Sequence, residues 1–164
     1  MTQREYIATF SKMSGQIIAV MSMIDFSVTL TIAYHFAKEK RKDDLLAVLL
    51  ERIQSFESKK QILNVMIDKH YKKFKEDNPT LIGDLGKMQT LRNIFAHSQI
   101  EVPENVNEFQ AAPYHDIGLS KTDTYASDKV RKFIIYTAKE HHENVKLLNG
   151  ILVAIQKLSE ETNK

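Results

Sequence analysis

The longest apolar stretch of the chain constrains its fold most. It reads IIAVMSMIDFSVTLTIAYHF, from Ile17 to Phe36, and a helix of about twenty such residues could cross a bilayer. Asp25 stands near its centre, at a cost of about 2.5 to 3.5 kcal/mol on membrane-insertion scales, and several serines and threonines dilute its hydrophobicity. The centre of a helical bundle also requires a helix that is apolar nearly all round. We therefore expect a buried central helix and no contact with a membrane.

The composition favours helices and excludes several kinds of site. Five glycines and three prolines in 164 residues leave few helix breakers. The chain has no cysteine, which excludes disulfides, a thiol nucleophile and the usual thiolate zinc sites. The sequence also lacks a glycine-rich phosphate loop, a nucleophile elbow and a cluster of metal ligands. We therefore predict an all-α protein with one domain over residues 1–164, no metal and no cofactor.

The spacing of apolar residues predicts an up-down bundle of about five helices. Ser58 and Gln61 form a capping box at the start of the third of these helices. Proline at the first helical position, after an asparagine cap, marks the start of the fourth. The predicted helices run from Gln3 to Lys40, from Asp43 to Ile53, from Ser58 to Phe74, from Pro79 to His97, and from Ser127 to the end of the chain.

Helical periodicity is lost from Gln99 to Ala126, where two of the three prolines fall. Structureless loops this long are uncommon in compact domains. The pattern predicts either a long loop or a short hairpin, around EFQAAPYHDIGLS, before the last helix. Tyr114 and His115 lie in this segment, and side chains of their kinds stack on unpaired RNA bases. Packing within the loop is the alternative role for both.

Arg92 occupies an unusual position in the fourth helix. At about 100° per residue, it falls in the middle of an apolar sector that also holds Leu85, Met88 and Phe95. A buried, unpaired charge costs several kcal/mol, so Arg92 needs an anion, a path to solvent or another chain opposite it. Asp25 is the only acid in the apolar part of the first helix. We predict that it pairs with Arg92, and a pair with no further role is the structural alternative.

Asn93 and His97 lie four residues apart and share a different face of the same helix. At this spacing the asparagine amide can hydrogen-bond the imidazole and fix its orientation. A histidine side chain can exchange protons near neutral pH. The three polar residues of LRNIFAHSQI therefore combine a fixed positive charge with a proton-transfer group.

The motif Arg92-Asn93-x-x-x-His97 resembles the Arg-polar-(three or four residues)-His signature of HEPN domains, the higher eukaryotes and prokaryotes nucleotide-binding superfamily. The long first helix with an internal acid, MIDFSVTLTIAYHF, and the order of the helices are also similar to that superfamily. The resemblance spans most of the chain in layout and is specific in about six residues. It implies a single HEPN-like domain and a metal-independent endoribonuclease, in which two copies of the motif face each other across a homodimer cleft.

The chemistry of RNA cleavage suits these residue types. Attack by the 2'-OH requires proton transfer at the 2' and 5' oxygens and positive charge near the transition state. We expect His97 to transfer protons, Arg92 to supply the charge, Asn93 to orient His97 or hold a phosphate, and Asp25 to support Arg92. Members of the superfamily also include modules that bind a nucleotide or a protein without cleavage, and such a silent module is the alternative function.

A basic cluster supplies the last expected contact with RNA. It comprises Lys69, Lys72, Lys73 and Lys75, at the end of the third predicted helix. These lysines are expected to guide the RNA backbone, although a solvated helix end is the common role of such a run. The resemblance further implies a cytoplasmic RNase of the toxin or antiviral-defence kind, with an antitoxin protein as a candidate partner.

Overall fold

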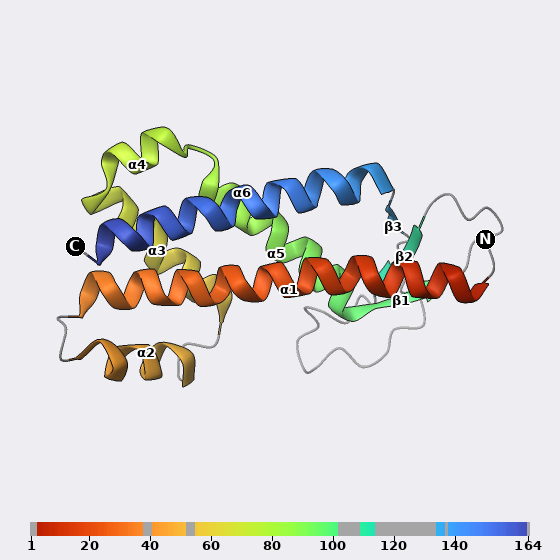
Figure 1. Cartoon of the computed structure of the whole chain (residues 1–164), viewed down its shortest axis with the longest axis horizontal. Helices are drawn as coiled ribbons and strands as arrows, with labels where there is room; N and C mark the ends of the chain where they lie inside the picture. Colours follow the sequence, from red (N-terminus) through yellow and green to blue (C-terminus); the bar gives the residue numbers. More distant parts are fainter. Residues whose placement is uncertain are drawn as a thin grey trace, which may run out of the picture. The chain divides into compact units, whose positions relative to one another are not determined.

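A computed structural model describes residues 3–37, 41–51, 55–101, 109–113, 134–136 and 138–163. These residues form an all-α bundle, as predicted, with six helices in place of about five and a small antiparallel sheet (Figure 1). The helices are α1 (Gln3–Phe36), α2 (Lys42–Glu51), α3 (Phe56–His70), α4 (Lys72–Asp77), α5 (Leu81–His97) and α6 (Ala138–Thr162). The strands are β1 (Ser98–Glu101), β2 (Phe109–Pro113) and β3 (Ile134–Tyr136).

The chain divides into two compact units. Unit 1 comprises residues 1–18 and 91–145, and unit 2 comprises residues 19–90 and 146–164. Each is described by itself below. Helices α1, α5 and α6 contribute residues to both units. The single domain expected from the sequence stays a prediction.

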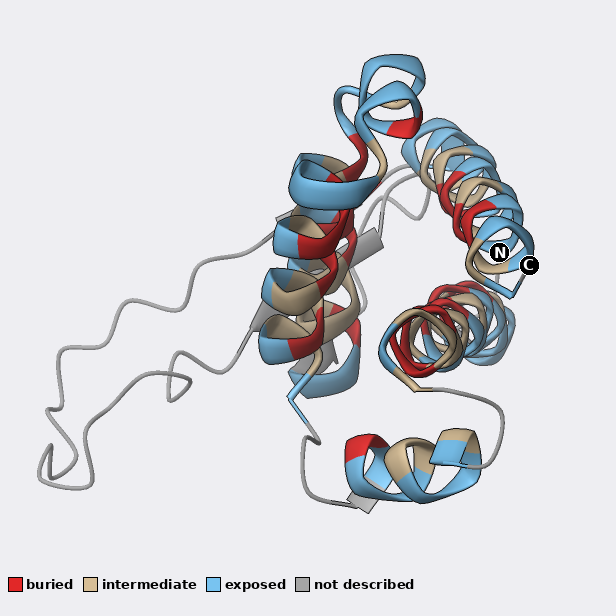
Figure 2. Cartoon of the chain, turned by 90° about the vertical axis from the view of Figure 1, so that its left-hand side faces the viewer, coloured by how far each residue is buried: buried red, intermediate tan, exposed pale blue. Residues whose placement is uncertain are grey.

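Buried residues form stripes along the helices, with exposed residues on the opposite sides (Figure 2). The stripe of α1 is the one predicted from the sequence: Ile17, Met21, Ile24, Val28 and Ile32 are all buried. The segment Ile7–Phe36 of α1 is long and apolar enough to cross a membrane, and 44% of its most apolar window is buried. A helix that forms the centre of a bundle shows the same pattern.

The third predicted helix starts earlier and is interrupted. Helix α3 begins at Phe56, and the hydroxyl of Ser55 accepts a hydrogen bond from the backbone N–H of Ser58. The predicted capping box at Ser58 is therefore wrong, because Ser55 is a suitable cap three residues upstream. Tyr71 leaves the helical conformation, with φ −128° and ψ 53°, and separates α3 from α4. Its hydroxyl lies 2.9 Å from Nδ1 of His35 on α1.

The last helix starts later than predicted. Helix α6 begins at Ala138, and Ile134–Tyr136, predicted as helical, form strand β3. Branched and aromatic side chains in succession favour a strand, and β3 pairs with β2, with Ala111 opposite Ile134. Strand β2 also pairs antiparallel with β1, so a hairpin does precede α6, although its first strand follows α5 directly. Tyr114, His115 and most of the predicted loop lie outside the described residues.

Candidate functional site

The end of α5 is fixed in unit 1 by Phe95. This residue is 6% exposed, and its ring lies 5.6 Å from that of Phe10 on α1 and 4.9 Å from that of Tyr136 on β3. The contact with Tyr136 is edge-to-face, a favourable arrangement of aromatic rings. Phe95 therefore anchors the helical turn that carries the predicted site residues.

A hydrogen-bonded cluster of α1, β3 and α6 side chains holds Tyr136 in turn. The Tyr136 hydroxyl accepts a hydrogen bond from Nδ2 of Asn144 at 3.1 Å and lies 3.5 Å from Nδ1 of His141. The other imidazole nitrogen of His141, Nε2, lies 2.8 Å from Oε1 of Gln16. Burial raises the pKa of Tyr136, and burial, with a smaller contribution from His142, lowers the pKa of His141.

This cluster was not predicted from the sequence. Its members are spread over three elements, and their spacing along the chain carries no pattern that would bring them together. The neutral form of His141 fits both contacts, because Nε2–H can donate to Gln16 while Nδ1 accepts from Tyr136. The cluster supports Phe95 and, through it, the turn of α5 that carries the predicted site residues.

Arg92 and Asn93 contact each other. Nη1 of Arg92 donates a hydrogen bond of 3.1 Å to Oδ1 of Asn93, and both residues are half-buried. The bond uses one of the two lone pairs of the Asn93 amide oxygen, and among the described residues no further bond engages its NH₂ group or the other guanidinium N–H groups. Asn93 was predicted to orient His97 or hold a phosphate, and its hydrogen bond among the described residues is with Arg92. The pair therefore presents mainly N–H donors, which is the chemistry of an anion site.

His97 is the last residue of α5 and is exposed. It follows Asn93 by one turn and lies about 160° around the helix from Phe95, since two residues advance about 200°. Its imidazole is thus accessible to a substrate. Arg92 lies within the angular range of the buried residues Leu81, Leu85, Met88 and Phe95. It is nevertheless only half-buried, because a long arginine side chain can carry its charged end towards solvent.

Asp25 has a different partner from the one predicted. Its carboxylate binds Nζ of Lys59 on α3 at 2.8 Å, within unit 2. The Lys59 side chain is only 4% exposed and that of Asp25 is 36% exposed. The prediction of an Asp25–Arg92 pair is therefore wrong, because Asp25 neutralises a buried ammonium that was not expected from the sequence. Lysine is rarely buried, and no local pattern identified Lys59.

The four lysines of the basic cluster differ in their surroundings. Lys69 at the end of α3 and Lys72 and Lys73 on α4 are exposed. Lys75 forms an ion pair with Asp68 at 2.7 Å. Three of the four predicted RNA-binding lysines are thus open to an external phosphate, and Lys75 already has a counter-ion.

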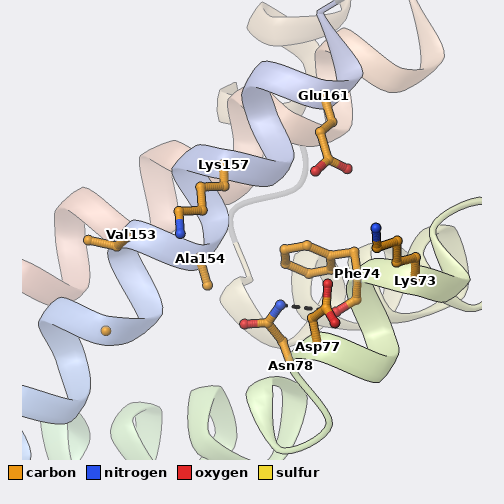
Figure 3. A pocket seen from close by; sticks show the side chains of 9 residues that line it. Lys73, Phe74, Asp77, Asn78, Val153, Ala154, Lys157 and Glu161 are labelled. Atoms are coloured by element: carbon orange, nitrogen blue, oxygen red, sulfur yellow. Dashed lines mark hydrogen bonds between the residues drawn. The ribbon is translucent and has the colours of Figure 1, made fainter.

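A pocket of about 470 Å³ lies between α4 and α6, and Lys73 is one of its lining residues (Figure 3). The charged lining residues are Lys73 and Asp77 from α4 and Lys157 and Glu161 from α6. The α6 side of this pocket was not predicted from the sequence, because Lys157 and Glu161 lie among other exposed charges near the end of that helix. The whole pocket belongs to unit 2.

Among the described residues, no group of three or more His, Asp or Glu side chains is arranged to hold a metal ion. The arrangement at the end of α5 can bind an anion through Arg92 and Asn93 and exchange a proton through His97. Comparisons of the chain with protein-family models, with curated proteins and with solved structures find no match.

Proposed function

We propose that this chain is a metal-independent endoribonuclease of HEPN type that acts as a homodimer. One observation carries the proposal: the hydrogen-bonded Arg92–Asn93 pair presents mainly N–H donors, one turn before an exposed histidine. The motif that suggested the function thus has side chains accessible at the end of an anchored helix. A purely structural arginine would be expected to face a carboxylate, and no ion pair of Arg92 occurs among the described residues.

The donors of Arg92 and Asn93 suit a scissile phosphate. A guanidinium binds phosphate oxygens in a bidentate manner, and the Asn93 NH₂ group can donate to a further oxygen. Charge builds up on these oxygens as the pentacoordinate transition state forms, so fixed donors stabilise it more than the ground state. This role requires no proton transfer from either residue.

His97 would move the protons. As the 2'-oxygen attacks the phosphorus, a neutral imidazole takes its proton, and the bond from phosphorus to the 5'-oxygen breaks. A protonated imidazole gives a proton to the leaving 5'-oxygen. The products are a 2',3'-cyclic phosphate and a 5'-hydroxyl, and no water is consumed. One chain supplies one motif histidine, so a second copy of the chain would supply the other.

The wider setting is also part of the proposal. Exposed Lys69, Lys72 and Lys73 would contact the RNA backbone, and binding would weaken as salt concentration rises. We propose a cytoplasmic toxin or antiviral-defence effector with an antitoxin protein as a partner. The central helix α1 would then serve the bundle core and not a membrane.

The test is cleavage of a mixed RNA pool by the purified protein in the presence of a chelator. We expect cleavage by the unmodified chain and 2',3'-cyclic phosphate ends on the products. His97→Ala and Arg92→Ala should each lower the rate by about 10²-fold or more. Sedimentation or size-exclusion measurements on the same samples should give a dimer.

Matched controls separate a site effect from loss of a charge. His142→Ala removes an exposed histidine from α6, and Arg41→Ala removes an exposed arginine next to α2. Both should cleave like the unmodified chain. Equal cleavage by the His97 variant and its control would refute the nuclease proposal. Binding of RNA or nucleotide without cleavage, lost in Arg92→Ala, would instead identify the silent module of the same fold.

A further inference from the structure

The pocket between α4 and α6 has a balanced set of charges. Each helix contributes one lysine and one acid: Lys73 and Asp77 on one wall, Lys157 and Glu161 on the other. Figure 3 shows Lys157 and Glu161 on α6, with Lys73 and Asp77 on the helix across the pocket from them. Opposite charges therefore occur on both walls of one pocket.

These four charges form no ion pair within the described part of the chain. Lys59, Lys60 and Lys87 of unit 2 do have acidic partners, whereas Lys69 and Lys72 are exposed and form no ion pair with a described residue, like the two pocket lysines. All four pocket charges are on exposed residues. Their ammonium and carboxylate groups are therefore available to a ligand.

The pocket also offers an apolar surface. The ring of Phe74, which is 7% exposed, points across the gap towards α6, where Ala154 and Val153 line the other wall. Gly150 completes this wall, and a Cβ atom added there would meet nothing within 4 Å. A glycine inside a helix costs about 1 kcal/mol relative to alanine. No described residue lies close enough to Gly150 to require a glycine there, and the missing side chain leaves this part of the pocket wall open.

We propose that this pocket binds a small zwitterion with an apolar ring, the chemistry of an aromatic amino acid or a short peptide. The anionic group of the ligand would lie against Lys73 or Lys157, its ammonium against Asp77 or Glu161, and its ring against Phe74. A purely anionic ligand would meet a carboxylate on each wall, and a purely cationic ligand would meet an ammonium on each wall. The volume of about 470 Å³ lies within the range of small-molecule sites.

The experiment compares three probes that share one ring. They are L-phenylalanine, which carries both charges, 3-phenylpropanoate, which carries only the carboxylate, and phenethylamine, which carries only the ammonium. Titration of the isotope-labelled full chain, followed by NMR, gives each dissociation constant. Phenylalanine should bind with a dissociation constant of about 1 mM, and the other two at least about fivefold more weakly. The dipeptide phenylalanyl-glycine distinguishes an amino-acid ligand from a peptide ligand.

Variants of the walls locate the binding. Gly150→Phe places a ring in the open space and should abolish binding. Lys157→Ala should weaken binding about two- to fivefold, since the ammonium is exposed and its ion pair screened. Lys146→Ala on the same helix is the matched control. Lys146 is exposed and lies outside the pocket, so this variant should bind the probes like the unmodified chain.

Several outcomes would overturn the proposal. The first is the absence of binding by both zwitterions at up to about 10 mM. Equal affinity for the three single-ring probes would show that the charges do not recognise the ligand. Binding that survives in a folded Gly150→Phe variant, checked by its unchanged helical circular dichroism, would place the ligand elsewhere. The proposal does not depend on the nuclease function and can fail or hold separately from it.

Discussion

Asp25 and Arg92 are both charged residues on otherwise apolar helix faces, yet they bind different kinds of partner. Asp25 in unit 2 binds the buried ammonium of Lys59 from another helix. Arg92 in unit 1 binds the neutral amide of its neighbour Asn93. A counter-charge explains Asp25 as a stabilising residue, and the absence of one among the described residues leaves Arg92 with donors to spare. The partner of a charge, more than its burial, thus indicates its role.

The largest expected effect contrasts these two positions directly. Asp25→Ala leaves the Lys59 ammonium buried without a counter-ion, and we expect it to lower the free energy of unfolding by about 2 to 4 kcal/mol. The value is set below that of a fully buried pair because the carboxylate is partly exposed. Arg92→Ala should cost less than about 1 kcal/mol, since it breaks one hydrogen bond of a half-buried residue. Urea denaturation followed by circular dichroism measures both.

A double substitution tests the cause. Asp25→Leu with Lys59→Met removes both charges and keeps similar volumes, so much of the lost stability should return. If Arg92→Ala instead proved as costly as Asp25→Ala, Arg92 would be a structural residue, and the contrast between the two would be lost.

Features that depend on the residues of a single helix could be predicted from the sequence. The buried stripe of α1 was found because helical spacing records burial directly: Ile24, Val28 and Ile32 recur on one face. The end of α5 at His97 was also predicted correctly. Patterns of this kind depend only on residues of one helix, so the sequence contains them in full.

Features that join distant segments were missed or assigned wrongly. Lys59 was overlooked because its burial depends on Asp25, 34 residues away along the chain. Strand β3 was predicted as helix because Ile134 fits a helical spacing, whereas its pairing with Ala111 decides its conformation. The walls of the pocket likewise come from α4 and α6. Contacts between distant segments are invisible to local periodicity.

One histidine in each unit should make the stability of the chain depend on pH. Burial lowers the pKa of His35 in unit 2, with a smaller effect of His70, and burial similarly lowers that of His141 in unit 1. The usual pKa of a histidine, about 6.5, applies in the unfolded chain. Just below this pH, the two histidines are therefore protonated in the unfolded chain while they are still neutral in the folded chain. Stability should therefore fall as the pH drops from about 7.5 to about 5.5.

Glutamine variants at the two positions measure each contribution. His35→Gln and His141→Gln should each flatten the decline of unfolding free energy with falling pH. Over this pH range, the change in unfolding free energy caused by either variant should be smaller than the loss caused by Asp25→Ala. Tyr136→Phe removes the hydroxyl next to Nδ1 of His141 and tests whether that contact helps to hold the ring neutral. An unchanged slope in both glutamine variants would mean that neither histidine is kept neutral by the fold.

The smallest effect compares two glycines, one facing a side chain and one facing the pocket. A Cβ atom at Gly86 would lie 3.3 Å from Nζ of Lys60, whose ion pair with Glu57 measures 2.7 Å, whereas Gly150 faces open space. Gly150→Ala should raise the free energy of unfolding by about 0.5 to 1 kcal/mol through helix propensity. Gly86→Ala should change it by less than about 0.5 kcal/mol, because the displaced ammonium offsets the same gain.

Denaturation of Gly86→Ala in a Lys60→Ala background separates these two contributions. With the ammonium gone, the added methyl group meets no other described residue within 4 Å, and the full propensity gain should appear relative to Lys60→Ala alone. A gain at Gly86 equal to that at Gly150 in the unmodified background would show that Lys60 moves aside without cost. In that case the space beside Gly86 is as open to a new side chain as the pocket wall at Gly150.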